Sequence, residues 1–216
     1  MPKKRPSSGE RVLKRMHIYC EGKKTEPNYI RSYIEDRFGD RLRDVVIVED
    51  AKTNTPIQLV REAIKSKNSG NHPDGDSYWV VYDRESPAKY KDSLHEDARR
   101  LAETNGIEIS LTNVCFEYWL ILHFEHSNAP YTSYDDLINN SCLKHKVRAI
   151  TNQSYDKGSP SIYRLVSSHI STARVRAKKI NAQTLSSAPA NVHKAHLLNP
   201  YTDMPKLLDA IDNFVP

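Results

Sequence analysis

Four acidic side chains each closely follow a short apolar run of the sequence: Glu21, Asp83, Glu85 and Glu117. If the apolar runs are parallel strands, their carboxyl ends share one edge of a sheet, and the loops that leave this edge converge. Carboxylates gathered there would repel one another unless a cation neutralised them. Hard ions with oxygen ligands, Mg²⁺ or Mn²⁺, match such a set, which assigns Glu21, Asp83 and Glu85 as metal ligands. The alternative is that each acid pairs with a neighbouring lysine or arginine in an ordinary ion pair.

The elements that must position these acids form four strand–helix units. Continuous apolar strands that alternate with helices are typical of a parallel sheet covered on both faces. We therefore predict an α/β fold with a central, mostly parallel four-stranded sheet and a helical C-terminal elaboration. The latter includes one long basic helix after Pro160 and a short final helix at 204–214. The predicted strands cover 16–20, 45–48, 78–82 and 107–111, and the helices that follow them cover 25–38, a stretch from 56, about 88–104, and 115–124.

Charge is distributed unevenly along the 216 residues, whose net charge is +5. Residues 1–19 carry net +5, residues 20–140 net −7 and residues 141–196 net +9. We expect a mobile basic arm over residues 1–12, an α/β domain over 13–126 and a basic helical region over 127–216 packed on it. The basic regions favour a polyanionic partner, and a simple solvated surface is the alternative.

Cationic side chains in two places are candidates for binding nucleic acid. One group lies in the loops after the strands, where Lys23 is a candidate catalytic cation and Lys24 and Arg84 are candidate phosphate contacts. The other group crowds the predicted basic helix: Arg174, Arg176, Lys178 and Lys179. Counterion release would drive such binding. A solvated helix face, or a docking surface for an acidic protein, is the alternative for the second group.

Several common classes of site have no support in the sequence. There is no GxGxxG motif, and the loop after the first strand is not a phosphate-binding Walker loop, because His17 stands where the first glycine would be. The three cysteines, at 20, 115 and 142, are far apart, which predicts free thiols in a reducing cytoplasm. No apolar run approaches the ~20 residues of a membrane helix.

Four segments together resemble the RloB-like family: IYCEGKKTEPNYI, YWVVYDRES, TNVCFEYWLILHFE and NPYTDMPKLLDAI. That family is similar to the Toprim fold of primases, topoisomerases and OLD-type nucleases. The resemblance implies that Glu21 is the lone Toprim glutamate and that Asp83 and Glu85 are the Asp-x-Asp pair, with glutamate in place of the second aspartate. It also implies that Glu117 is the additional acid of OLD-type nucleases. The family is associated with anti-phage defence and with an ABC-type ATPase partner.

Two main hypotheses follow. The first is a Mg²⁺- or Mn²⁺-dependent nuclease of an anti-phage defence system, acting on DNA or RNA, with Glu21, Asp83, Glu85, Glu117 and Lys23 in the catalytic site. The second is a non-catalytic subunit of a defence complex that binds nucleic acid or a partner, in which the acids are structural. A third hypothesis is an enzyme that acts on a phosphate of a small nucleotide. It is supported only by a sheet edge that is suited to binding phosphate. The oligomeric state is left open.

Overall fold

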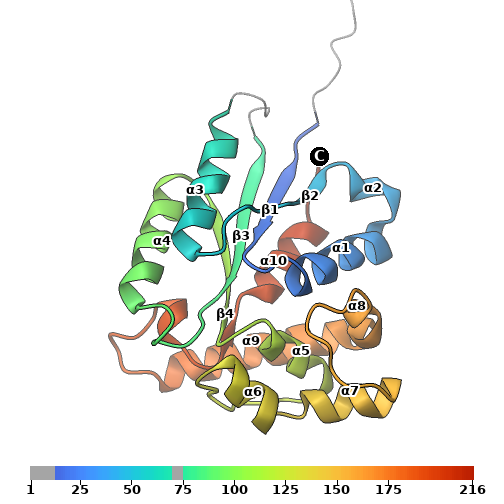
Figure 1. Ribbon diagram of the computed structural model, residues 1–216. Helices are drawn as coiled ribbons and strands as arrows, with labels where there is room; N and C mark the ends of the chain where they lie inside the picture. Colours follow the sequence, from blue (N-terminus) through green and yellow to red (C-terminus); the bar gives the residue numbers. More distant parts are fainter. Residues whose placement is uncertain (1–12, 70–74) are drawn as a thin grey trace, which may run out of the picture.

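The computed structural model describes residues 13–69 and 75–216, so the arm predicted over residues 1–12 lies outside the described residues. Its centre is a five-stranded sheet of order β2-β1-β3-β4-β5 (Figure 1). The first four strands are parallel to one another, as predicted. The strands are β1 (Met16–Cys20), β2 (Val46–Glu49), β3 (Ser77–Asp83), β4 (Glu108–Asn113) and β5 (Tyr201–Thr202).

The prediction of four strands was one strand short. The two residues of β5 pair antiparallel with Thr112 and Asn113 of β4 and extend the sheet at its edge. A two-residue strand has no periodicity that a sequence pattern can reveal, because its partners are about 90 residues away. The consequence is that the C-terminal chain is part of the sheet and not an addition beside it.

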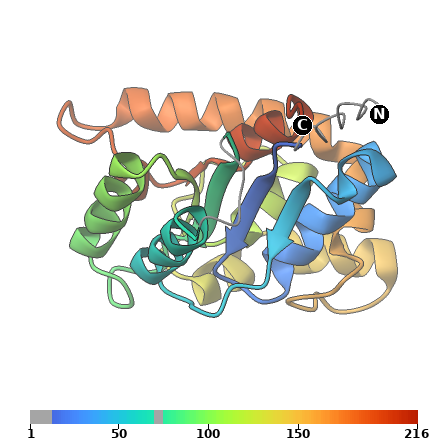
Figure 2. The same cartoon turned by 90° about the horizontal axis from the view of Figure 1, so that it is seen from above.

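The sheet divides two apolar cores, because successive side chains of a strand point to opposite faces. On β3, Trp79 and Val81 belong to one core and Val80 and Tyr82 to the other. Helices α3 (Pro56–Lys67) and α4 (Asp92–Thr104) cover the second core. Figure 2 shows this pair on one side of the sheet, with α1 and α10 on the other. The predicted covering of both faces is therefore confirmed.

The helices agree with the predicted units, with one difference in the C-terminal region. The long basic helix predicted after Pro160 is broken, because a 3₁₀ turn (Ser167–His169) separates two α-helices there. The remaining helices are α1 (Thr25–Phe38), α2 (Asp40–Arg43), α5 (Glu117–Phe124), α6 (Tyr134–Asn140), α7 (Leu143–Thr151), α8 (Ile162–Val166), α9 (Ile170–Ser187) and α10 (Met204–Asp212), with a second 3₁₀ turn at Ala195–Leu197.

Helix α5 lies at the centre of the molecule and joins the sheet to the helices that follow. Residues Glu117 to His123 are all buried, so the helix is enclosed on every side. An apolar helix with no polar face is typical of such a position. Helices α7, α8 and α9 pack against it, so the helices from α6 to α9 surround α5 and lie at the carboxyl end of the parallel strands, whereas α10 turns back along the sheet (Figure 1).

Candidate metal centre

Glu21 and Asp83 lie next to each other at the carboxyl ends of two adjacent strands. Strand β1 pairs in parallel with β3 at Cys20 and Val81, and each acid comes just beyond that pair. The backbone N–H of Asp83 donates a hydrogen bond of 3.1 Å to Glu21 Oε2. The phenol of Tyr90 lies 3.0 Å from Glu21 Oε1 and 3.0 Å from the carbonyl oxygen of Asn54. The sheet topology thus brings together two acids that are 62 residues apart in sequence, and the hydroxyl of Tyr90 holds the Glu21 carboxylate in place.

The carboxylate of Asp83 faces the side of the sheet that α1 and α5 cover. Alternation along β3 places it with Trp79 and Val81, which pack in that core. Asp83 is 7% exposed, so its carboxylate is removed from most of the water. The first turns of α1 and α5 supply the groups that surround it.

Glu26, in the first turn of α1, is a site residue that the sequence analysis missed. It is only 6% exposed, and its carboxylate lies against Gly22: a Cβ on Gly22 would stand 2.1 Å from Glu26 Oε2. A glycine is therefore needed at 22 for this close approach. The signal was present in the sequence, because Glu26 opens the helix that follows β1 and thus lies at the same edge as Glu21.

Glu117, the first residue of α5, is fully buried and reaches the same place. Its Oε1 accepts a hydrogen bond of 3.0 Å from the Tyr155 hydroxyl and lies 3.6 Å from the ammonium of Lys157. Its Oε2 is buried without any hydrogen-bond partner among the residues described. The C-terminal region therefore supplies two groups of the site, Tyr155 and Lys157, which the sequence analysis did not identify.

Glu85 lies beyond the end of β3, so its two-residue spacing from Asp83 does not align the two side chains. Strand β3 ends at Asp83, and Glu85 has a left-handed backbone with φ of 59°. Its N–H donates to the carbonyl oxygen of Val114, and its Oε1 accepts a 2.6 Å ion pair from Lys89. Glu85 nevertheless lines the same cavity as Glu21 and Asp83, on its outer side.

The pKa shifts show how strongly these acids interact. Burial raises the pKa of Glu21 to about 7, although the hydrogen bonds from Asp83 and Tyr90 oppose this rise. Burial also raises the pKa of Asp83 well above its usual range, and the charges of Glu26, Glu117, Glu21 and Glu85 raise it further, in that order. For Glu26 the pKa is raised by burial and then by Glu117, with Lys157 acting in the opposite direction. The metal-free site therefore resists full ionisation.

A cavity of about 390 Å³ opens onto this cluster. Four lysines line it together with the acids. Lys23 and Lys24 come from the loop after β1 and are exposed, Lys89 pairs with Glu85, and Lys157 comes from the C-terminal region. A ring of cations around buried carboxylates suits a substrate that is itself anionic and that reaches a cation at the centre.

The chemistry of the donor set fits a hard divalent cation. Glu21, Glu26, Asp83 and Glu85 line the cavity, and the fully buried Glu117 lies close enough to raise the pKa of Asp83. Among the described residues, Oε2 of Glu117 is a buried acceptor without a donor. Carboxylate oxygens are the ligands that Mg²⁺ and Mn²⁺ prefer. Over residues 13–69 and 75–216, no three His, Cys, Asp or Glu side chains are already closed around a point that could hold an ion. The acids surround the cavity and do not form a tight ligand cage.

Arg84 does not fit its predicted role as a nucleic-acid contact. It is 4% exposed, and its guanidinium donates to the carbonyl oxygens of His196 and Tyr90 at 3.0 and 2.9 Å and to Asp92 at 2.5 Å. All of these partners are internal to the protein. Arg84 therefore holds the loop after β3 against α4 and the C-terminal chain. The sequence pattern placed it correctly after the strand but could not show its burial.

Most of the cations predicted on the basic helix are also engaged within the protein. Arg174 binds Asp212 at 2.6 Å and Asp209 at 3.1 Å, and Lys178 binds Asp209 at 2.7 Å. Arg176 donates to the carbonyl oxygens of Leu122 and His123. These side chains tie α9 to α10 and α5. Of the four predicted cations, Lys179 alone is exposed without a described partner.

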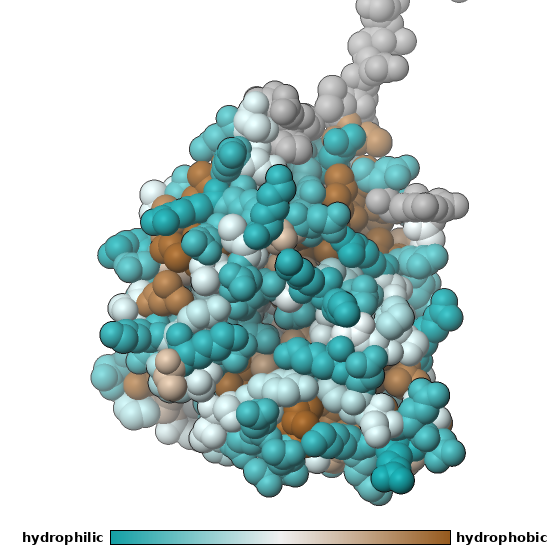
Figure 3. Space-filling model, in the orientation of Figure 1, coloured by the Kyte–Doolittle hydropathy of each residue, from teal (hydrophilic) through white to brown (hydrophobic). Residues whose placement is uncertain are grey.

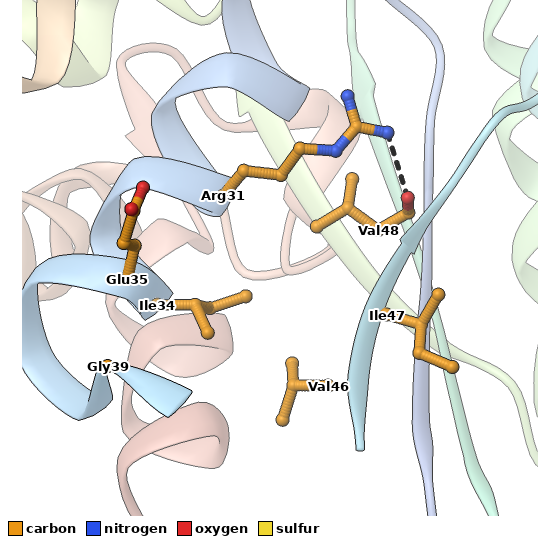
Figure 4. A pocket seen from close by; sticks show the side chains of 7 residues that line it. All are labelled: Arg31, Ile34, Glu35, Gly39, Val46, Ile47 and Val48. Carbon is orange, nitrogen blue, oxygen red and sulfur yellow. Dashed lines mark hydrogen bonds between the residues drawn. The ribbon is translucent and has the colours of Figure 1, made fainter. Parts of the chain in front are cut away.

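A second cavity, of about 480 Å³, lies beside the open edge of β2 (Figure 4). Its walls are mostly apolar, with Ile34 of α1 facing Val46 and Val48 of the strand. The charged residues of its lining are Arg31, which donates to the carbonyl oxygen of Val48 at 2.9 Å, and Glu35. A single carboxylate beside an arginine does not make a cation site, so the acidic cavity is the better candidate.

A model of the RloB-like protein family matches residues 16–211. The chain is a member of the RloB-like family. All five carboxylates of this RloB-like chain, and the lysines around them, fall within the matched residues. No curated protein and no solved structure matches the chain. No helix among the residues described is long and apolar enough to cross a membrane.

Proposed function

We propose that this RloB-like chain is a metal-dependent nuclease whose α/β domain is Toprim-like. The observation that carries the proposal is the convergence of carboxylates at the carboxyl edge of a parallel sheet, where four acids line one cavity and the charge of a fifth, Glu117, acts on Asp83. One buried oxygen, Oε2 of Glu117, lacks any described donor. The family resemblance points to four of these acids: Glu21, Asp83, Glu85 and Glu117. Mg²⁺ or Mn²⁺ would be held by Glu21, Asp83 and Glu85, with Glu26 and Glu117 as further ligands. Bound there, it would activate the attacking water and neutralise charge on the phosphate.

Other residues around the cavity would orient the metal ligands and bind the substrate. Tyr90 and the N–H of Asp83 orient the Glu21 carboxylate. Lys157, 3.6 Å from Glu117, and Lys23 at the rim provide positive charge beside the scissile phosphate, where charge grows in the transition state. Lys24 is placed to hold a flanking phosphate. The loop from Tyr155 to Gly158 covers one side of the cavity and limits the access of water.

The test is hydrolysis of plasmid DNA and of single-stranded RNA by the purified full-length protein in Mg²⁺ or Mn²⁺. Asp83→Asn and Glu21→Gln should lower the cleavage rate by about 10²-fold or more, since each removes a charged ligand. The matched control is Asp97→Asn, which removes an exposed carboxylate on α4 and should cleave at the wild-type rate. Equal cleavage by all four proteins would overturn the assignment. Binding without cleavage by any of them would favour a non-catalytic subunit of a defence complex.

The resemblance also supports a biological setting. We propose a role in anti-phage defence, with an ABC-type ATPase as partner, because both accompany the family. Repeating the cleavage assay with a purified ABC-type ATPase from the same organism would test the partnership. The expected result is that ATP and the partner change the rate for the wild type and leave Asp83→Asn inactive.

A further inference from the structure

The exposed face of α7 carries a row of cations that have no acidic partner among the residues that the structure describes. Leu143 and Val147 are buried, and the helix packs against α5 and α6. Lys144 and Arg148, one helical turn apart, are exposed. Residues 141–166 contain five lysines and arginines but a single acid, Asp156. The surface over α7 in Figure 3 is correspondingly hydrophilic.

The cations of α7 differ from those of α9 in their ion pairing. In the described residues, no ion pair joins Lys144, Lys146 or Arg148 to a carboxylate, and Lys144 donates only to the side chain of Asn139. By contrast, Arg174 and Lys178 of α9 are paired with acids of α10. Like charges at i and i+4 cost a few tenths of a kcal/mol in an isolated helix. A polyanion laid across the face would turn this repulsion into attraction.

The same helix leads directly to the acidic cavity. It ends at Thr151, and six residues later Lys157 lies at the cavity beside Glu117. Six residues span at most about 20 Å, and the loop is anchored at both sides. Tyr155 binds Glu117, and the carbonyl oxygen of Gly158 accepts from Asn28 of α1 at 3.2 Å. The C-terminal end of α7 is therefore within about six nucleotide steps of Lys157, at 3.4 Å per step, and Arg148 and Lys144 lie about 5 and 10 Å further back along the helix.

We propose that Lys144 and Arg148 of α7 bind the phosphate backbone of the nucleic acid that the acidic site cleaves. The inference rests on the proposed nuclease function and, within the basic C-terminal region that sequence reasoning favoured, assigns the binding surface to α7, because most of the cations of α9 are engaged within the protein. The interaction is with phosphates and is independent of base sequence. The strand then runs from α7 along the 152–158 loop to Lys157 and into the cavity.

The test compares two charge-reversal pairs with the same spacing and the same change in net charge. Lys144→Glu/Arg148→Glu removes the proposed surface, and Arg61→Glu/Lys65→Glu makes the same change on the exposed face of α3. Binding of labelled duplex DNA and of single-stranded RNA is measured by fluorescence anisotropy in EDTA, so that cleavage plays no part. The α7 pair should weaken binding at least tenfold. It should also reduce the slope of log K against log salt by about 1.8 for duplex or 1.4 for single strands. The α3 pair should change neither value appreciably.

Equal weakening by both pairs, no weakening by the α7 pair, or no binding by the wild type would each overturn the proposal. Thermal melts of both variants check that weaker binding does not result from unfolding. Because the substituted side chains are exposed, the Tm should be unchanged. Different results would contradict the nuclease proposal and the α7 proposal. A wild type that binds through α7 and never cleaves in Mg²⁺ or Mn²⁺ contradicts the nuclease alone. Cleavage that is insensitive to the α7 pair contradicts the α7 surface alone.

Discussion

The Lys157 ammonium lies 3.6 Å from Glu117 Oε1 and 4.1 Å from the centre of the Tyr134 ring. Burial lowers the pKa of Lys157, but the charges of Glu117 and Asp83 more than offset this and raise it. The lysine is held between an aromatic face and a buried carboxylate, and it belongs to a region far from β1 and β3 in sequence. It partly neutralises the acidic cluster in the metal-free protein, and the first predictions follow from this balance.

Replacing Asp83 with asparagine should stabilise the metal-free protein while abolishing catalysis. Asp83 is surrounded by four other carboxylates, and its pKa is raised by burial and by their charges. Removing its charge should lower the repulsion and raise the Tm by roughly 2–4 °C, the shift expected for about 1 kcal/mol in a chain of this size. Differential scanning calorimetry in EDTA at pH 8 measures the shift. A lower Tm for Asp83→Asn would contradict the proposed repulsion.

Divalent metal should stabilise the wild type and leave Asp83→Asn nearly unaffected. An ion that binds only the folded state adds RT ln(1 + [L]/Kd), which is about 2.7 kcal/mol at a concentration one hundred times Kd. The Tm should therefore rise with Mn²⁺ and Mg²⁺ at pH 8. Asp97→Asn serves as the control, with a rise equal to that of the wild type. An equal response in Asp83→Asn would place the ion elsewhere.

A methyl group at Gly22 should impair the site without unfolding the protein. A Cβ there would stand 2.1 Å from Glu26 Oε2, and the flexible side chain of Glu26 can move away at little cost. Gly22→Ala should therefore lower the cleavage rate tenfold or more with a Tm change below about 2 °C. In Gly22→Ala/Glu26→Ala the glycine substitution should add nothing to the effect of Glu26→Ala. Additive losses of cleavage rate in the double variant would mean that Gly22 affects the rate independently of Glu26.

Gly158→Ala should destabilise the protein and loosen the Lys157 loop. Gly158 has φ of +87°, and a Cβ would stand 2.8 Å from the Cβ of Lys24. A left-handed backbone that a side chain rarely adopts, combined with this overlap, should cost about 1–3 kcal/mol. Urea denaturation measures the loss, which should appear as a lower midpoint at unchanged m-value. Stability equal to the wild type would show that the loop is not held against α1.

His17 should make the stability depend on pH through a buried ion pair. It is 1% exposed, and its ring nitrogens lie 2.7 Å from Glu49 and 3.0 Å from Asp76. Burial lowers its pKa, but the hydrogen bonds to Glu49 and Asp76 outweigh burial and raise it above 6.5. The stabilisation is therefore fully present below pH 6.5 and is lost as the pH rises through the folded-state pKa. Urea denaturation measures the free energy of unfolding of the wild type and of His17→Gln. The wild type should exceed the variant by more at pH 5.5 than at pH 9.

The parallel sheet and the meeting of Glu21 with Asp83 were predictable, because apolar strands of four or five residues alternate with helices and carboxyl ends share an edge. The presence of Lys157 and Tyr155 at the site was not predictable, because they reach Glu117 only when a loop distant in sequence packs against it. The burial of Arg84 depends on Asp92 and on backbone carbonyls, such as that of His196, which no sequence spacing reveals. The two-residue spacing of Asp83 and Glu85 would align their side chains only in a strand that runs through both residues, and β3 ends at Asp83.

The short pairing of Tyr201 and Thr202 with β4 limits how this protein can be dissected. Asn181 of α9 both donates to the carbonyl oxygen of Thr202 and accepts from its N–H, so β5 fastens the long helix to the sheet margin. A truncated chain that stops at residue 126 would expose an unpaired strand and would lack Lys157. We therefore expect such a fragment to lose both stability and part of the site.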